Sequence, residues 1–564
     1  MPILESLKAA AGLEDLATIL GYKPSGLAYI IYRLPDAKKY TKFTIPKKSG
    51  GEREICAPIE PLKMLQRRLA NILYACRDQI DSEQNRRPLS HGFRRKYSII
   101  TNAQNHKRRR FVLNLDLQDF FPTFNFGRVR GFFILNNDFK LNAKIATLIA
   151  QIACFENGLP QGSPSSPVIS DLIAHLLDVR LAQLAKTHLL TYSRYADDLT
   201  FSTSQREFPA AVARPAAGNG GEWELGDDLV NAIKRVDFAI NPGKTRMQFR
   251  MSRQLVTGLT VNAKVNIRPE YYRYSRAMCD TLFGGGTYYR PYEKDTPITS
   301  LNPLEGVLSH IHHVRDTVDQ RDNQEKKRHP TATRRLYARF LQYRYFVALE
   351  RPLIVCEGKT DNIYLKYAIS KLPAFQPKLG AWEGKSFKCA VSFFNYHNKA
   401  HDILDIGGGI GPLKFFFISS RFKKIIEGFK HRPLKFPVIV LVDNDKAAIE
   451  IFNTIKSNYQ INITTTSQEK FFHITDNLYL VKTPPCEADG TSYIENFFPP
   501  PLLQTQLDGK KFNPHKEHEA DGEYGKFVFA EKVVRPNADN IDFSGFTPLL
   551  EGITAVIDHY TTPG

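Results

Sequence analysis

Apolar and polar residues recur along the first third of the chain with the periods of helices and short strands. Residues 1–40 carry apolar side chains at helical spacing, most clearly in Leu13–Leu20, and predict packed helices. Residues 43–58 predict two strands joined by a Gly-Gly turn. Residues 62–73 predict an amphipathic helix with a basic outer face, and residues 168–184 a long apolar helix after a turn-rich loop.

Two predicted strands in this region end in carboxylates. Residues 110–116 form a hydrophobic run that ends at Asp116, and residues 191–202 predict a β-hairpin with Asp197 and Asp198 at its turn. Adjacent acids at a turn are most often simply solvated. Strands that bring Asp116 beside Asp197 would instead hold a pair of hard divalent cations through oxygen ligands. Two such ions are the arrangement that catalyses nucleotidyl transfer.

A different pattern begins near residue 351. Residues 352–361 predict a buried strand that ends at Glu357 and leads into a helix. Residues 437–445 predict another buried strand, followed by Asp443 and Asp445. Buried strands separated by helices predict a parallel sheet, with its site at the carboxyl ends of the strands. Three convergent acids predict a second divalent-metal site there.

Composition and charge narrow the class of partner. A chain of 564 residues is too long for one core, so three or four packing units are expected. Its formal charge of +19 favours a polyanionic partner, and nucleic acid fits best. No apolar run approaches the length of a membrane span and no signal peptide is recognisable, so no membrane partner is expected. Seven scattered cysteines are typical of a reducing cytoplasm.

The acidic hairpin carries a family resemblance. Tyr195-Ala-Asp-Asp198, with the strand that ends at Asp116, resembles the palm of reverse transcriptases. Asn102-Ala-Gln-Asn-His106 and Val256-Thr-Gly258 are similar to two signatures of bacterial retron reverse transcriptases. The resemblance runs from about residue 41 to about residue 277. It implies a right-hand polymerase with two Mg²⁺ ions at the three aspartates. We interpret His106 as a structural hydrogen-bonding residue.

The same resemblance implies substrate-binding roles for side chains outside the acid cluster. Arg53 would grip the incoming triphosphate together with a lysine, either Lys47 or Lys48, because cations neutralise charge on the leaving group. Phe121 would exclude a ribose 2′-hydroxyl, which favours dNTPs. Gln161 would lie in the loop under the template and incoming base. Lys244 would act as an acid toward pyrophosphate or bind phosphate, and the sequence leaves both roles open.

The C-terminal part resembles a TOPRIM domain between Pro352 and Phe498, on its Glu-Gly and Asp-x-Asp pairs. In this reading residues 403–406 predict the intermediate strand. Glu495 and Lys526 resemble the additional acid and lysine of the overcoming-lysogenisation-type nuclease branch, although a plain surface acid explains Glu495 equally well. The resemblance implies Mg²⁺ or Mn²⁺ at Glu357, Asp443 and Asp445. The fold class is then an α+β right-hand polymerase (fingers, palm and helical thumb) followed by an α/β TOPRIM domain with a parallel sheet.

We therefore expect five segments, in chain order: N-terminal helices and fingers (1–100), palm (101–262), thumb and linker (263–345), TOPRIM domain (346–500) and its extension (501–564). Retron membership implies copying of a structured non-coding RNA into branched single-stranded DNA (msDNA). The TOPRIM part would then be a nuclease in anti-phage defence, with host RNA or DNA as its target. A second copy of the chain is a further candidate partner.

Two alternatives stay open at this point. One is another reverse transcriptase lineage, such as a group II intron maturase or an abortive-infection polymerase. The two retron signatures argue against it. The other makes the C-terminal part a non-catalytic nucleic-acid-binding or assembly module.

Overall fold

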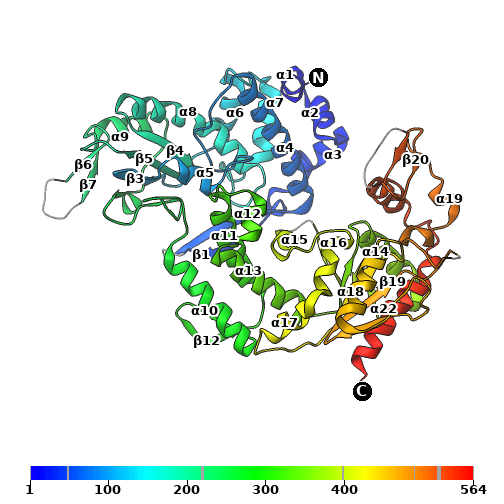
Figure 1. Ribbon diagram of the computed structural model, residues 1–564. Coiled ribbons are helices and arrows are strands. Elements are labelled where there is room, and N and C mark those ends of the chain that lie inside the picture. The colour runs from blue at the N-terminus through cyan, green and yellow to red at the C-terminus, as the bar shows by residue number, and fades with distance from the viewer. Residues whose placement is uncertain are drawn as a thin grey trace. The chain divides into compact units, whose positions relative to one another are not determined.

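The computed structural model describes residues 2–47, 50–216, 222–396, 399–487, 489–516 and 522–562, and it divides the chain into two units. The N-terminal unit comprises Met1–Pro269 and Val314–Asp319. The C-terminal unit comprises Glu270–His313 and Gln320–Gly564. Figure 1 colours the chain from its N-terminus to its C-terminus. Each unit has its own sheet, and each is described by itself below.

The N-terminal unit begins with the helices that the sequence predicts, followed by the predicted hairpin. The helices are α1 (Ile3–Ala9), α2 (Leu13–Leu20) and α3 (Pro24–Ala28), and the strands are β1 (Tyr40–Pro46) and β2 (Glu52–Pro58). Gly50 and Gly51, both with positive φ, form the turn between the strands. The hairpin is antiparallel, with Tyr40 opposite Pro58.

Long helices supply most of the core of this unit. Their apolar faces pack on α1, α2 and the sheet described next, and together they bury one continuous hydrophobic cluster. They are α4 (Glu60–Glu83), α6 (Phe126–Leu135), α7 (Ala143–Ala153), α8 (Ser166–Thr187) and α9 (Asp227–Lys234). The predicted amphipathic and apolar helices are therefore both present, and each is longer than its periodic segment.

An antiparallel sheet carries the acidic hairpin. Its strands follow the order β4-β5-β3-β8, with bounds Thr191–Tyr195, Asp198–Thr203, Phe111–Asp116 and Arg246–Phe249. Tyr195 pairs with Asp198 across the turn, as the sequence predicts. Every residue of β5 except the first is buried, and β5 lies inside the sheet, between β4 and β3. The small hairpin β6 (Ala213–Pro215) and β7 (Trp223–Leu225) stands beside this sheet.

A buried histidine bridges the two strands of the acidic hairpin, β4 and β5. His106 lies just after α5 (Ile99–Gln104) and its two ring nitrogens contact Ser193 Oγ on β4 and Ser202 Oγ on β5, each at 2.7 Å. Ser193 also donates to Asn102 Oδ1 at 2.6 Å. These contacts agree with a structural role for His106.

The second retron-like signature lies against the same helix. Val256 and Gly258 belong to or follow the short strand β9 (Leu255–Val256), which pairs with β10 (Leu259–Thr260). Thr257 Oγ1 donates to the carbonyl of Ile99 at the start of α5, at 3.2 Å. Both signatures therefore meet behind the acidic hairpin and support its strands.

The C-terminal unit contains the predicted parallel sheet. Its strand order is β16-β13-β17-β19-β18, with bounds Ser392–Phe393, Leu353–Cys356, Val438–Val442, Leu478–Lys482 and Phe472–Thr475. The first four strands are parallel and β18 is antiparallel at the edge. One expectation is wrong: residues 403–406 do not form the intermediate strand. Ile403 and Leu404 end the helix α15 (Lys399–Leu404), because a short apolar run fits a buried helix as well as a strand.

Successive residues of the central strands face two different cores. Val438, Val440 and Val442 of β17 belong to one cluster, whereas Ile439 and Leu441 belong to the other. The first cluster also contains residues of α10 (Pro269–Gly285), α11 (Asn302–Thr317) and α13 (Ala332–Gln342). The second contains residues of α14 (Asp361–Lys371) and α22 (Thr547–Thr561). Both faces are covered, as a parallel sheet requires.

The remaining elements of this unit are short. They are β11 (Tyr288–Arg290), β12 (Glu293–Ile298), α12 (Asn323–Arg328), β14 (Gly380–Glu383), β15 (Ser386–Cys389), α16 (Ile410–Leu413), α17 (Arg421–Glu427), α18 (Ile449–Tyr459), α19 (Pro500–Leu503), β20 (Lys511–Phe512), β21 (Glu523–Tyr524), α20 (Lys526–Val528) and α21 (Arg535–Asn537). Within the described ranges, no helix of either unit combines the length and apolarity that crossing a bilayer requires.

Burial of His106 predicts a loss of stability in acid. Burial lowers the pKa of His106 to about 3, so between that value and the usual 6.5 the unfolded chain binds the extra proton and the folded chain does not. Stability should therefore fall by about 2 kcal/mol between pH 7 and pH 5 through this residue. His106→Asn should flatten the pH dependence of the urea unfolding midpoint. Equal slopes in the wild-type protein and in His106→Asn would contradict the assignment.

Candidate functional sites

Three carboxylates lie at one end of the sheet of the N-terminal unit. Asp116 ends β3 and stands directly opposite Asp198, the first residue of β5. Asp197 occupies the hairpin turn, and its carbonyl accepts a hydrogen bond from Leu117 N at 3.0 Å. Ala196, before it, has a φ of +57°. The structure thus places β3 beside the turn as the sequence predicts.

The close approach of these acids changes their protonation. Loss of water around Asp198, followed by the charges of Asp197 and Asp116, raises its pKa to about 7. Burial is also the main cause that raises the pKa of Asp197. A cation bound between the three groups would relieve their mutual repulsion and would hold all of them ionised.

Lys244 supplies one positive charge at this position. It ends a short helical turn, Pro242–Lys244, and its Nζ lies 2.8 Å from Asp116 Oδ2. Asn241 Nδ2 donates to the other oxygen of Asp116 at 3.3 Å. The hydrogen bond with Asp116 raises the pKa of Lys244. With 52% of its side chain exposed, the ammonium remains accessible to a ligand.

The donor chemistry of the three aspartates fits divalent magnesium. Carboxylate oxygens are the ligands that hard cations prefer. After loss of hydration, the charges of Asp197 and Asp116 contribute to the raised pKa of Asp198, and a bound cation would offset both effects. Among the described residues, no group of three or more His, Cys, Asp and Glu side chains has the geometry of a metal site. The fit therefore rests on charge and ligand type.

The β1–β2 hairpin brings basic residues toward the acidic turn. Arg53 lies on β2. Burial raises the pKa of Asp197, and the positive charge of Arg53 partly offsets this rise. Lys47 lies at the hairpin turn and is exposed, with its backbone N–H donating to Gly51 O at 2.9 Å. Lys48, the alternative lysine, lies outside the described residues.

The loop that contains Gln161 is attached to the same hairpin. Gln161 O accepts from Cys56 N at 2.8 Å, and a Cβ on Gly162 would lie 2.8 Å from Cys56 O. Gly162 has a φ of +117°, so only glycine fits this approach. Gln66 of α4 accepts from Ser163 Oγ at 2.8 Å and holds the loop from below. Gln161 itself is half-buried.

The two neighbouring phenylalanines have different surroundings. Phe120 is buried and stacks on Phe238 at a centroid distance of 6.0 Å, so it is the core residue of the pair. Phe121 is half-buried and its ring lies 5.9 Å from that of Phe93. Phe121 is therefore the one of the two whose ring is free to meet a ligand.

A second group of acids lies at the carboxyl ends of β13 and β17 in the C-terminal unit. These strands are parallel neighbours, so Glu357 and Asp443 emerge side by side, and Glu357 Oε2 accepts from Asp443 N at 3.4 Å. Asp443 Oδ1 also accepts from Ile494 N at 2.9 Å. Asp445 points to the next helix, where its Oδ1 accepts from Ala448 N at 2.9 Å.

Glu495 and Lys526 join this second group. Glu495 lies in the helical turn Ile494–Phe497 and is only 2% exposed, so it is not the surface acid that sequence reasoning left open. Lys526 Nζ lies 3.0 Å from Glu495 Oε2 and 3.6 Å from Asp443 Oδ2. Burial raises the pKa of Glu357 and of Glu495 to about 7. Carboxylates alone would again suit a hard cation.

Sequence reasoning missed one member of this site. Asp361 begins α14, is 4% exposed, and accepts from Gly358 N at 2.7 Å. Its charge contributes to the raised pKa of Asp443, after the effect of burial. Gly358 has no room for a side chain, because a Cβ would lie 2.8 Å from Asp361 Oδ1. The signal in the sequence was the spacing Glu-Gly-x-x-Asp, because it puts a second acid at the first residue of the helix that follows the strand.

The palm-like sheet, the fingers-like hairpin and the acidic turn define the first unit as that of a template-copying polymerase. A family model described as reverse transcriptase (RNA-dependent DNA polymerase) matches residues 45–261. Retron Ec86 reverse transcriptase of Escherichia coli is 34% identical over 277 residues, which cover 48% of this chain and 78% of that protein. This chain belongs to the retron reverse transcriptase family.

Two further similarities are more distant or less complete. Retron Mx65 reverse transcriptase of Myxococcus xanthus is 36% identical over 286 residues, 47% of this chain, and the match spans only 61% of that relative's length. Among solved structures, telomerase from Candida albicans in complex with a fragment of telomeric RNA gives a TM-score of 0.29 at 11% identity. That match covers 53% of this chain and 60% of that one. A TM-score this low supports no argument about fold.

The buried lysine of the second site generates a prediction. Lys526→Met leaves Glu495 and Asp443 without their counter-charge, so it should destabilise the C-terminal unit by roughly 3–5 kcal/mol. The folded pKa values of these acids then rise further above their unfolded values, and stability should fall as the pH rises from 6 to 8. Lys371→Met, at a lysine paired with exposed Asp539, is the control and should change stability little. Thermal unfolding at both pH values measures the difference, and a pH-independent loss would contradict this account.

Proposed function

We propose that this chain is an RNA-directed DNA polymerase that copies a structured non-coding RNA. The observation that carries the proposal is the convergence of Asp116, Asp197 and Asp198 at one end of an antiparallel sheet. Family membership supports it, because proteins named retron reverse transcriptases share the match. The formal charge of +19 supports a nucleic-acid partner.

The proposed roles come from the family resemblance, and the positions of the side chains support them. Two Mg²⁺ ions held by the three aspartates would supply Lewis-acid stabilisation of the reacting oxygens. Arg53 and Lys47 bind the triphosphate of the incoming dNTP by charge-assisted hydrogen bonds. Phe121 lies below the sugar and excludes a 2′-hydroxyl. Gln161 positions the nucleotide from the loop that its carbonyl ties to the hairpin.

We assign to Lys244 an interaction with the phosphates of the incoming nucleotide. Its ammonium is bound to Asp116 and half-exposed. With cations held by the three aspartates, the Lys244 ammonium would no longer be needed as the counter-charge of Asp116. It would then bind phosphate or donate its proton to the departing pyrophosphate. The product in this proposal is branched msDNA, primed from a 2′-hydroxyl of the same RNA.

Loss of one turn carboxylate tests the polymerase assignment. Asp197→Asn should lower extension of a DNA primer on an RNA template by more than about a hundredfold, because it removes a metal ligand and its charge. Binding of the co-purified RNA, identified by sequencing, should be unchanged. Asp227→Asn, at an exposed acid of α9, is the matched control. Substantial synthesis by Asp197→Asn would refute the assignment.

We propose further that the C-terminal unit is a TOPRIM nuclease that acts in anti-phage defence. The supporting observation is the parallel sheet with Glu357 and Asp443 at adjacent strand ends and Asp361 at a helix end. Asp445, the third predicted ligand, lies near enough for its charge to contribute to the raised pKa of Glu357. Mg²⁺ or Mn²⁺ held there would activate water for phosphodiester cleavage. Glu495 would accept the proton of that water and Lys526 would bind the scissile phosphate, in host RNA or DNA. If the unit does not cleave, it is a nucleic-acid-binding or assembly module.

Substitutions at the second site separate these two readings. In the full chain, Glu357→Gln and Asp443→Asn should each abolish metal-dependent cleavage of RNA or DNA, because each replaces a carboxylate ligand by a neutral amide. The associated toxicity in cells should be lost as well. Primer extension should remain at the wild-type level. Glu383→Gln, at an exposed acid of β14, is the control for surface charge. Cleavage that survives both changes would leave the non-catalytic reading in place.

A further inference from the structure

Four buried ionic side chains form a continuous series of ion pairs next to the acidic turn, and none of them has a part in the chemistry described above. Arg77 comes from α4, Asp171 and Asp178 from α8, and Arg194 from β4. Their exposed fractions are 4%, 3%, 0% and 0%. Arg77 pairs with Asp171, whose other oxygen accepts from Arg194 Nη2 at 2.9 Å. Arg194 also makes a two-point contact with Asp178, at 2.8 and 2.7 Å.

One end of the network holds the backbone of the turn. Arg194 Nη1 donates to the carbonyl of Ala196 at 3.1 Å, and Ala196 has the left-handed φ that precedes Asp197. The loop that contains Gly92 runs alongside β4, with His91 N donating to Arg194 O at 2.8 Å. A Cβ on Gly92 would lie 2.4 Å from Ala196 N, so this loop is in van der Waals contact with the turn. The position of the turn is thus set from both sides.

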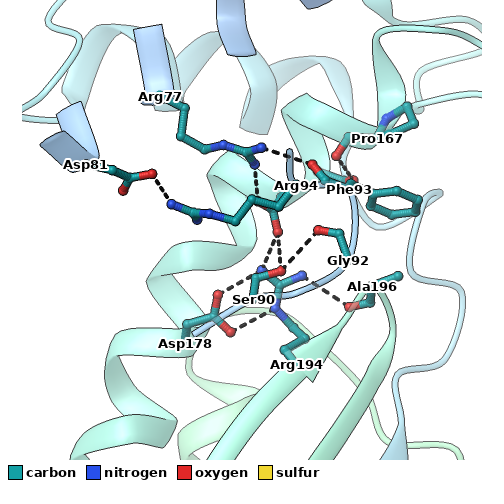
Figure 2. Close-up of polar contacts among 12 residues, drawn as sticks. Arg77, Asp81, Ser90, Gly92, Phe93, Arg94, Pro167, Asp178, Arg194 and Ala196 are labelled. Atoms are coloured by element: carbon teal, nitrogen blue, oxygen red, sulfur yellow. Dashed lines mark hydrogen bonds and ion pairs between the residues drawn. The ribbon is translucent and has the colours of Figure 1, made fainter. Parts of the chain in front are cut away.

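The other end reaches the proposed sugar-contacting ring. Arg77 Nη2 donates to the carbonyl of Phe93 at 3.0 Å, and Phe93 is held at a φ of +55°. The ring of Phe93 lies behind Phe121. Ser90 ties the same loop to the network, since its Oγ donates to Asp171 Oδ1 at 2.5 Å. Figure 2 shows Arg77 directed to Phe93 and Arg194 directed to Ala196 from opposite sides of the network.

A network of this kind is not explained by stability alone. Buried charges lose their hydration, and apolar side chains of similar volume often stabilise a fold as well or better. Burial alone would lower the pKa of Arg194, but Asp178 and Asp171 outweigh it and raise the pKa above its usual value, so the guanidinium stays charged. What apolar side chains could not do is fix two backbone carbonyls through rigid, directional donors.

We propose that Arg77 and Arg194, bridged by Asp171, are positioning residues, Arg194 for the acidic turn and Arg77 for the ring of Phe121. Arg194 holds the turn that carries Asp197, and Arg77 holds Phe93 against Phe121. The inference rests on the proposed DNA synthesis and deepens it, because it makes sugar discrimination depend on a residue that touches neither substrate nor metal.

Arg77→Lys separates positioning from stability. Lysine keeps the charge opposite Asp171 but lacks the planar fork that also reaches the Phe93 carbonyl. A cavity of about 40 Å³ lined by Arg77, Ser90 and Asp171 leaves room for a water beside the shorter side chain. With dNTPs, kcat should fall less than about threefold, whereas the ratio of kcat/KM for rNTPs to that for dNTPs should rise about tenfold.

The matched control is Arg68→Lys, on the same helix. Arg68 also donates to backbone carbonyls, those of Leu20 and Gly21, but it lies apart from the network. Arg68→Lys should leave the ratio of kcat/KM for rNTPs to that for dNTPs unchanged. Phe93→Leu removes the ring behind Phe121 without touching a charge, and it should reproduce the loss of discrimination even if Arg77→Lys does not fold. Arg194→Lys should instead lower kcat at least about tenfold with little change in that ratio.

Thermal unfolding of each variant accompanies the kinetics. The proposal is overturned if folded Arg77→Lys or Phe93→Leu lowers incorporation of rNTPs and dNTPs by the same factor, because that is the effect of general destabilisation. It is also overturned if Arg194→Lys keeps the wild-type kcat. Failure of the proposed function has a different signature: the wild-type protein and the Arg68→Lys control would both fail to extend the primer while remaining folded.

Discussion

Carboxylates packed together at strand ends, away from bulk water, are the constraint on which both units depend. In each unit two neighbouring strands deliver acids to one edge of a sheet, where loss of hydration, followed by the charges of neighbouring acids, raises the pKa of at least one acid to about 7. Each unit also places one lysine there. Lys244 is half-exposed and is free to change partners when a ligand arrives. Lys526 has only 24% of its side chain exposed and contacts two acids, so it is a fixed part of its site.

The strands and the acids at their ends could be predicted from the sequence because their signals are local. Asp116, Glu357 and Asp443 each come at the end of a short apolar run, and Asp197 lies at the turn of a predicted hairpin; the structure places all four there. The hairpin turn and the parallel sheet follow from the same periodicity. The run at 403–406 failed because four apolar or acidic residues do not distinguish a buried helix from a strand.

The network behind the turn could not be predicted, since its members come from three distant segments. Arg77, Asp171 and Arg194 each look like an ordinary charged residue in sequence. Only the spacing of Asp171 and Asp178, seven residues apart on an otherwise apolar helix, indicates two acids on one buried face. Their partners depend on how α4, α8 and β4 pack, which is a property of the tertiary fold.

The two faces of the C-terminal sheet belong to different hydrophobic cores, and this limits where the chain can be divided into fragments that fold. Residues on one side of β13 and β17 share their core with α10, α11 and α13, which precede the sheet in the chain. A fragment that begins at residue 346 would expose that apolar side to water and would tend to aggregate. The C-terminal sheet and helices α10, α11 and α13 therefore have to be inherited together, so a recombination breakpoint is more easily tolerated near residue 270 than between α13 and β13.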